Sequence, residues 1–75
     1  MHRAGEVRGI AQGVAVLRCE GETHPDIGTE VIDESLETVG RVVDVFGPVG
    51  RPYLAVTPTD DVHVPTLVGE TLYAR

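Results

Sequence analysis

Lysine is absent from this 75-residue chain, which carries six arginines against twelve acidic residues and a formal net charge of −6. A protein that follows the phosphates of a nucleic acid usually carries a basic patch, so this balance argues against such a binder. Arginine without lysine in an acidic chain favours a salt-adapted (halophilic) host, although GC-rich coding would produce the same bias. At molar salt the Debye length falls to about 3 Å, so surface ion pairs would add little to any partner contact.

Cysteine occurs only once, as Cys19, so no disulfide can form within the chain. A single thiol without a disulfide framework fits a reducing compartment better than secretion. Because Cys19 precedes an acidic loop, we expect a raised thiol pKa and a buried, inert side chain. The first residues lack the apolar stretch of a signal peptide, and no run of about 18 apolar residues could span a membrane. These absences predict a cytoplasmic protein without a membrane partner.

Groups that could support catalysis or metal binding are also scarce, since three histidines and one cysteine are too few for a structural zinc site. The segment Glu20–Asp26 places carboxylates and one histidine at alternate positions, but Gly21 and Pro25 make a regular strand improbable. A solvated acidic loop explains this segment and Asp60–His63 better. Ser35 has no nearby histidine or nucleophile elbow. We therefore expect no enzyme, no catalytic residue, no metal and no cofactor.

Glycine and proline instead recur every few residues among abundant valines, and no stretch of ten residues carries a helical apolar stripe. This pattern predicts short strands joined by tight turns. Six short strands cannot form a sandwich of two full sheets, but they can close on themselves and so remove exposed edges. The prediction is an all-β fold, a small closed six-stranded barrel that forms one domain over residues 1–75. The expected strands are Gly5–Ala11, Val14–Cys19, Thr29–Ile32, Thr38–Phe46, Tyr53–Thr57 and Glu70–Ala74, with an irregular loop at Pro58–Pro65.

The apolar side chains suffice for one small core. Val42 and Val43 are adjacent in the sequence, so only one of them can face inward. The charge of Asp44 favours the register in which Val43 faces inward and Val42 outward. The expected core residues are Val7, Ile10, Leu17, Ile27, Val31, Val39, Val43, Val45, Leu54, Val56 and Leu72.

One hairpin, Asp44–Val56, gathers the only phenylalanine, one of the two tyrosines, two prolines and two glycines. If the alternate residues of its strands fill the barrel, Phe46 and Tyr53 both point outward beside a turn stiffened by proline. A stiff surface with exposed aromatic rings is typical of an interface hot spot, because little entropy is lost on binding. The alternative is that both rings plug the end of the barrel.

The string D-V-F-G-P-V-x-x-P-Y, from Asp44 to Tyr53, resembles the core signature of the glycine/arginine-rich protein subunit of H/ACA ribonucleoproteins. Weaker matches are the Met-x-Arg-x-Gly start, the Gly13 turn, Ile27-Gly28, and the closing segment Val68–Tyr73. The chain lacks the Gly/Arg-rich tails of eukaryotic members and is similar to the tail-less archaeal form.

The resemblance implies a Greek-key barrel of the elongation factor/reductase type. It also implies a non-catalytic subunit that docks on a dyskerin-type pseudouridine synthase. There the subunit would assist substrate RNA loading and release during rRNA pseudouridine synthesis, and so ribosome biogenesis. Contact with the H/ACA guide RNA would be indirect, with little direct nucleic-acid contact. The docking residues carried over from the signature are Phe46, Gly47, Pro48, Val49, Pro52 and Tyr53.

The alternative is a stand-alone barrel that binds RNA or a ligand directly. Direct RNA binding requires basic residues clustered on one face. The arginines are spread along the sequence, which weakens the case for this alternative, but folding could still gather them on one face. They are Arg3, Arg8, Arg18, Arg41, Arg51 and Arg75.

Overall fold

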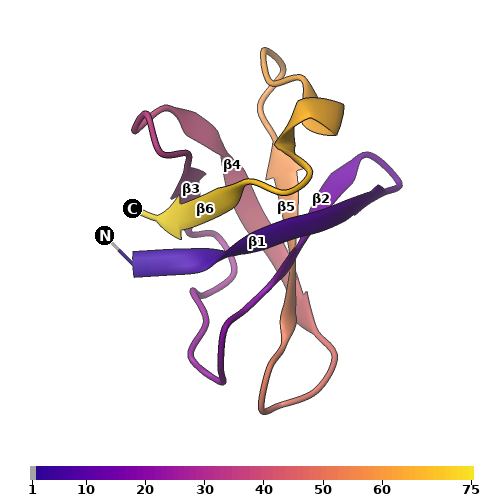
Figure 1. Cartoon of the computed structure of the whole chain (residues 1–75), viewed down its shortest axis with the longest axis vertical. Helices are drawn as coiled ribbons and strands as arrows, with labels where there is room; N and C mark the ends of the chain where they lie inside the picture. Colours follow the sequence, from indigo (N-terminus) through magenta and orange to yellow (C-terminus); the bar gives the residue numbers. More distant parts are fainter. Residues whose placement is uncertain (1) are drawn as a thin grey trace.

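Six antiparallel strands close into a barrel in the order β1-β2-β5-β4-β3-β6 (Figure 1). The computed structural model describes residues 2–75, so Met1, the first residue of the expected domain and of the Met-x-Arg-x-Gly start, lies outside the described residues. The all-β prediction and all the expected strands are confirmed, with β1 beginning three residues earlier than expected. The strands are β1 His2–Ala11, β2 Val14–Arg18, β3 Glu30–Ile32, β4 Thr38–Phe46, β5 Tyr53–Pro58 and β6 Thr71–Ala74.

The connections explain how so short a chain closes. Gln12 and Gly13 have φ angles of 52° and 81°, the pairing of positive values that a two-residue type I′ hairpin between β1 and β2 requires. Strands β3, β4 and β5 follow one another as neighbours, and β6 returns beside β3, which is a Greek-key arrangement. The start of β1 and the end of β6 lie side by side, because His2 pairs with Ala74 (Figure 1).

Small aliphatic side chains fill the barrel, and neither the phenylalanine nor a tyrosine belongs to the core cluster. Val45 is partly buried and packs against this cluster, as expected. The cluster consists of Ala4, Val7, Ala15, Leu17, Cys19, Val31, Val39, Val42, Leu54, Val56, Leu67 and Leu72.

The expected register of the two adjacent valines is wrong. Val42 is buried, whereas Val43 is 45% exposed. A β-bulge explains why Val42 faces inward and Val43 outward. Val42 pairs with Val56 on β5, while Asp44 pairs with the adjacent residue, Ala55. Val43 is therefore an extra residue without a partner on β5, and strict alternation fails at this point.

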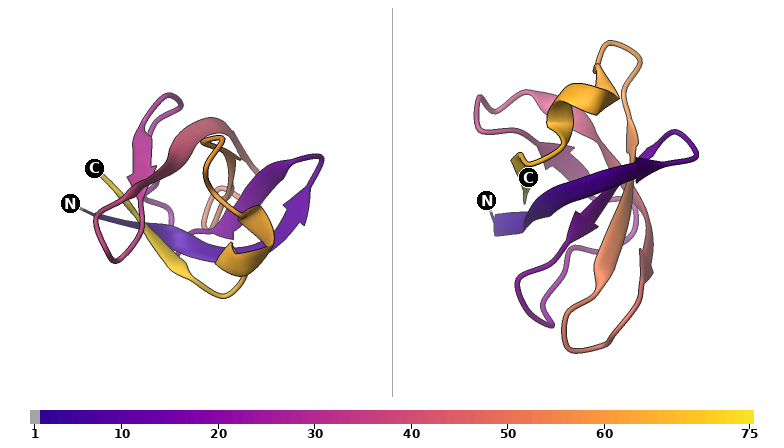
Figure 2. Two further views of the ribbon diagram at one scale, coloured as in Figure 1. Left: turned by 90° about the horizontal axis from the view of Figure 1, so that it is seen from above. Right: turned by 45° about the vertical axis from the view of Figure 1, so that its right-hand side comes forward.

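Two further expected core residues lie at the surface. Ile10 is 40% exposed, because it belongs to the end of the β1–β2 hairpin, which projects beyond the barrel (Figure 2). Ile27 is 63% exposed and belongs to the loop before β3. That loop is held through its backbone, with the Gly28 N–H donating to the Val42 carbonyl at 2.7 Å, so it does not need the Ile27 side chain.

A short 3-10 helix, η1 (Val64–Leu67), adjoins the segment expected to be irregular and overlaps its last two residues. Pro65 stands at its start, where a missing N–H costs nothing. Its last residue, Leu67, is buried and joins the core cluster, so η1 covers part of the barrel (Figure 2). Among residues 2–75 no helix is long and apolar enough to cross a membrane.

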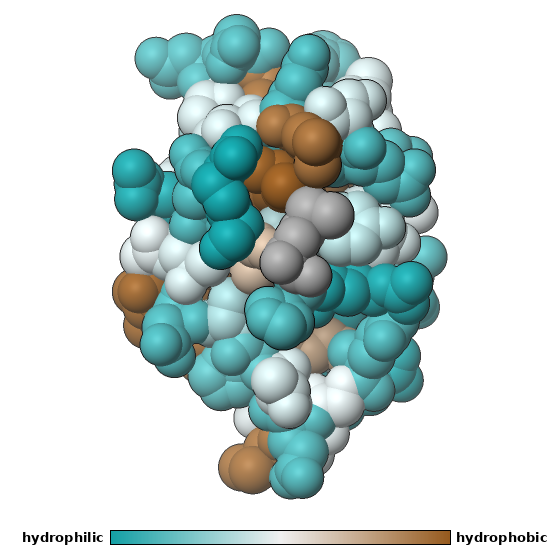
Figure 3. Space-filling model, turned by 90° about the vertical axis from the view of Figure 1, so that its left-hand side faces the viewer, coloured by the Kyte–Doolittle hydropathy of each residue, from teal (hydrophilic) through white to brown (hydrophobic). Residues whose placement is uncertain are grey.

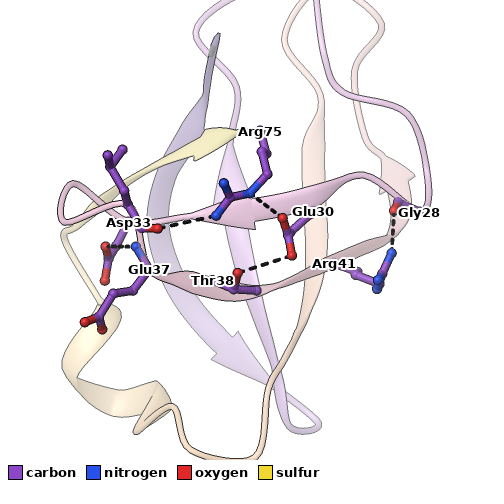
Figure 4. A network of polar contacts seen from close by, with 8 residues as sticks. Gly28, Glu30, Asp33, Glu37, Thr38, Arg41 and Arg75 are labelled. Carbon is purple, nitrogen blue, oxygen red and sulfur yellow. Dashed lines mark hydrogen bonds and ion pairs between the residues drawn. The ribbon is translucent and has the colours of Figure 1, made fainter.

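Polar contacts fasten β6 to β3 and β3 to β4 (Figure 4). The Arg75 side chain forms an ion pair with Glu30, and the Arg75 N–H donates to the Glu30 carbonyl at 3.0 Å. The other carboxylate oxygen of Glu30 accepts from the Thr38 hydroxyl at 3.2 Å. Arg41 donates to the Gly28 carbonyl at 3.2 Å. Two of the six arginines are thus engaged on this side of the barrel.

Candidate functional site

Phe46, the last residue of β4, pairs with Tyr53, the first residue of β5. Their rings are stacked, with centroids 5.6 Å apart and planes 17° from parallel. Phe46 is 43% exposed and Tyr53 is half-buried. Beyond the bulge at Val43, the residues of β4 alternate between inside and outside as expected. The prediction that Phe46 points outward is therefore correct, although the predicted register of Val42 and Val43 is wrong.

The turn between these strands supports the ring pair. Gly47 has a φ of +88°, and a Cβ at this position would lie 2.9 Å from Cδ2 of Tyr53, so only glycine fits without strain. The Arg51 N–H donates to the Pro48 carbonyl at 3.2 Å and closes the turn. Val49, at its tip, is 86% exposed. The turn therefore presents apolar side chains on a backbone that is locally constrained.

A shallow hollow of about 280 Å³ lies beside this turn. It brings together five of the six predicted docking residues, namely Phe46, Gly47, Pro48, Val49 and Pro52. The sixth, Tyr53, does not line the hollow but stacks on Phe46. Pro52 is buried, and its carbonyl accepts from the Cys19 N–H at 3.0 Å, so it fixes the turn more than it offers surface. We call these six residues the docking edge.

The same hollow contains residues that sequence reasoning did not assign to it. Val45 lines it from β4, while Glu22 and His24 come from the loop between β2 and β3. The sequence predicts only a solvated acidic loop there, and no local pattern shows that this loop approaches the docking edge. Figure 3 shows one face of the barrel, where hydrophilic residues predominate and apolar ones form small, separated groups.

Arg18 on β2 contacts the docking edge from the neighbouring strand. Its Nη1 donates to the Tyr53 hydroxyl at 2.7 Å, and its guanidinium carbon lies 4.7 Å from the centre of the Tyr53 ring. Arg51 also reaches β2's end, since its Nε donates to the Cys19 carbonyl at 2.9 Å. Both arginines thus tie the β4–β5 turn to β2, which the sequence did not reveal.

Cys19 is 1% exposed, and its burial raises the pKa of the thiol. The expectation of a buried thiol is confirmed, with desolvation as the cause of the shift. The neutral thiol therefore serves the core, where it belongs to the apolar cluster.

A larger hollow of about 540 Å³ lies at the start of β4, away from Phe46. Three carboxylates line it, those of Asp33, Glu37 and Asp61. Within residues 2–75 no three histidine, cysteine, aspartate or glutamate side chains are placed to hold a metal ion together. This hollow therefore offers acidic surface without an identifiable binding chemistry.

Comparison with known proteins defines the class to which this barrel belongs. A family described as "Gar1/Naf1 RNA binding region" matches residues 1–75, so the match covers the whole chain. The chain belongs to the Gar1/Naf1 family, which is an RNA-binding and non-catalytic family. This confirms the resemblance seen in the string from Asp44 to Tyr53.

Two archaeal proteins are similar over part of the chain. An uncharacterised protein of Methanocaldococcus jannaschii is 39% identical over 49 residues, which are 64% of this chain and 59% of the relative. An uncharacterised protein of Methanothermobacter thermautotrophicus is 34% identical over 50 residues, which are 63% of this chain and 54% of the relative. The chain therefore spans less than two thirds of the length of either relative.

Family membership supports a function associated with H/ACA ribonucleoproteins. Because the family description names RNA binding, the expectation of little direct nucleic-acid contact finds no support.

Proposed function

We propose that this chain is a non-catalytic, cytoplasmic subunit of an H/ACA guide-RNA ribonucleoprotein and docks on a dyskerin-type pseudouridine synthase. In that complex it assists the loading and release of substrate RNA during pseudouridine synthesis in ribosomal RNA, and so ribosome biogenesis. The observation that carries the proposal is the docking edge, an exposed Phe46 held by the Tyr53 ring at the end of a constrained hairpin.

The docking edge has the physical properties of a protein-binding surface. Phe46 and Val49 expose apolar area that the barrel core does not use. The stacked ring and the glycine turn restrict their motion, so binding costs little further entropy. The hollow beside them, of about 280 Å³, could receive a side chain of the synthase. An aromatic anchor beside a pocket is the usual arrangement of an interface hot spot.

The charge of the chain is consistent with this mode of binding. With a net charge of −6, the chain as a whole gains little from long-range attraction to RNA. An apolar contact is not screened by salt, in contrast to exposed ion pairs. The proposed docking therefore suits a host with a high internal salt concentration.

A turnover experiment tests the proposed role in loading and release. The synthase and guide RNA are assembled with and without this chain, and pseudouridine formation is followed with excess enzyme and then with excess substrate RNA. If the chain assists release, it raises the multiple-turnover rate more than the single-turnover rate, because product release limits only the former. An equal effect on both rates would assign the chain to loading or to the chemical step and not to release, and no effect on either rate would contradict the role.

A further inference from the structure

Folding gathers four of the six arginines around one hollow of about 240 Å³. We call this feature the arginine hollow. Its charged residues are Arg3, Glu6, Arg8, Arg18, Glu20 and Arg51.

Strand register explains how arginines far apart in the sequence meet here. Glu6 on β1 lies directly between Arg18 on β2 and Thr71 on β6 in the paired strands. A β-bulge between Val7 and Gly9 makes Arg8 an extra residue, and it is exposed on the outside of β1. Arg51 arrives from the β4–β5 turn and is held at the end of β2 by its bond to the Cys19 carbonyl. The hollow thus forms where β1, β2 and the β4–β5 turn meet.

The arginine hollow is locally positive, although the chain as a whole is negatively charged. Four arginines and two glutamates line it, a surplus of two positive charges in a chain of net charge −6. Both glutamates are engaged, Glu20 with Arg3 and Glu6 with Arg8 at 3.0 Å. These are exposed pairs, which contribute little to stability and exchange readily with solvent or another charge.

The remaining two arginines keep unused donors. Within residues 2–75, neither Arg18 nor Arg51 forms an ion pair with a carboxylate. The Nε of Arg18 is buried and has no hydrogen-bond partner among the described residues. A ligand oxygen would therefore meet the other guanidinium nitrogens, of which Nη2 of Arg18 and both Nη atoms of Arg51 form no hydrogen bond within residues 2–75. The planar guanidinium groups match the oxygens of a phosphate, to which arginine can donate two parallel hydrogen bonds.

We propose that the arginine hollow binds two neighbouring phosphodiester groups of an RNA backbone, one at Arg18 and one at Arg51. The family description names RNA binding without locating it, and the hollow supplies a location. The contact between Arg18 and Tyr53 places this site next to the docking edge, so one barrel can touch a protein partner and RNA together. The inference does not depend on docking to the synthase, because it is tested on the isolated chain.

The primary test measures binding of a fluorescent single-stranded RNA of about 12 nucleotides, a length that several phosphate contacts can span. The measurement is made at the lowest KCl concentration that leaves the circular dichroism spectrum unchanged, and then at rising KCl. If two phosphates are neutralised, the logarithm of the association constant falls against the logarithm of salt with a slope of roughly −1.4. Inorganic phosphate serves as competitor and distinguishes a free anion from an RNA backbone.

Matched variants locate the binding. Arg51→Gln should weaken RNA binding several-fold and flatten the salt slope by about 0.7, because one phosphate contact is lost. Arg41→Gln is the control, since Arg41 also donates to one backbone carbonyl but lies outside the hollow. Glu20→Gln should strengthen binding by freeing Arg3, whereas Glu37→Gln, an exposed acid elsewhere, should change it much less.

Three outcomes would overturn the proposal. Equal losses in Arg51→Gln and Arg41→Gln would show a response to net charge without a site. Absence of RNA binding by the folded chain at every salt concentration would remove the proposed ligand. Saturable binding of inorganic phosphate without binding of RNA would assign the hollow to a free anion. A loss confined to the variants of the hollow, together with the gain in Glu20→Gln, would support it.

Discussion

Arg18 holds Tyr53 by two contacts at once, a hydrogen bond of 2.7 Å to the phenol and a guanidinium carbon 4.7 Å from the ring centre. Tyr53 in turn stacks on Phe46. The three side chains come from β2, β5 and β4, which are consecutive neighbours in the barrel. The docking edge and the arginine hollow therefore share one support, and a change in Tyr53 is expected to affect both.

Two substitutions at Tyr53 separate these contributions. Tyr53→Phe keeps the ring but removes the acceptor of Arg18, so it should lower the free energy of unfolding by about 1 kcal/mol and leave docking nearly intact. Tyr53→Ala also removes the stacking partner of Phe46 and should weaken docking by roughly 1–3 kcal/mol. Urea unfolding and calorimetric titration measure the two effects. Complete unfolding of Tyr53→Ala would show instead that the ring belongs to the structural core.

Gly47 is expected to be essential to the β4–β5 turn. Gly47→Ala places an L residue at a φ of +88° and a methyl group 2.9 Å from the Tyr53 ring. The backbone alone should cost roughly 1–2 kcal/mol, and displacement of the ring should weaken docking further. Gly50→Ala is the control in the same turn, because its Cβ would meet nothing within 4 Å. Equal behaviour of the two variants would contradict the role assigned to Gly47.

Barrel closure depends on a close approach at Gly40. A Cβ on Gly40 would lie 2.0 Å from the Thr57 carbonyl oxygen, and a backbone atom cannot move aside as a side chain can. Gly40→Ala should therefore destabilise the fold by about 3 kcal/mol or more. Gly9→Ala, also on a strand, meets nothing within 4 Å and should be tolerated. Thermal unfolding of the two variants compares them, and a stable Gly40→Ala protein would argue against the pairing of β4 with β5 described above.

Burial of Cys19 predicts a stability that depends on pH. Because the folded state raises the pKa of the thiol, folding favours the protonated form. Its contribution is fully present below the unfolded thiol pKa of about 8.5. It is lost as the pH rises through the higher pKa of the folded state, since the unfolded chain then ionises more easily. Cys19→Ala should be less stable at neutral pH, but its stability should fall less steeply above that range. Parallel curves for the two proteins would contradict the shift.

The reactivity of Cys19 provides an independent measurement. A thiol-specific disulfide reagent should react slowly with the native chain and rapidly in denaturant, because the thiol is buried and protonated. Rapid reaction with the native protein would show that the end of β2 opens easily.

The sequence predicted the strands well because glycine, proline and valine mark turns and strands locally. The burial of Val42 in place of Val43 could not be predicted in the same way, since a bulge exists only relative to the partner strand β5. The approach of Glu22 and His24 to the docking edge is likewise a property of the folded loop.

The arginine hollow is the clearest example of a feature that could not be predicted from the sequence. Arg3, Arg8, Arg18 and Arg51 are scattered in sequence. The register of β1 with its neighbours and the bond of Arg51 to the Cys19 carbonyl bring them together. By contrast, the outward position of Phe46 was predictable, because alternation resumes beyond the bulge and the signature string pointed to the same hairpin.

The measurement that tests the central claim most directly is a calorimetric titration of this chain into its host's dyskerin-type synthase at molar salt, with Phe46→Ala as the test variant and Val68→Ala as the control. Both side chains are exposed, but only Phe46 belongs to the docking edge. Docking through this edge predicts tight binding that persists in salt, a loss of roughly 1–3 kcal/mol in Phe46→Ala, and no loss in Val68→Ala. Absence of binding, or equal binding by all three proteins, would contradict it.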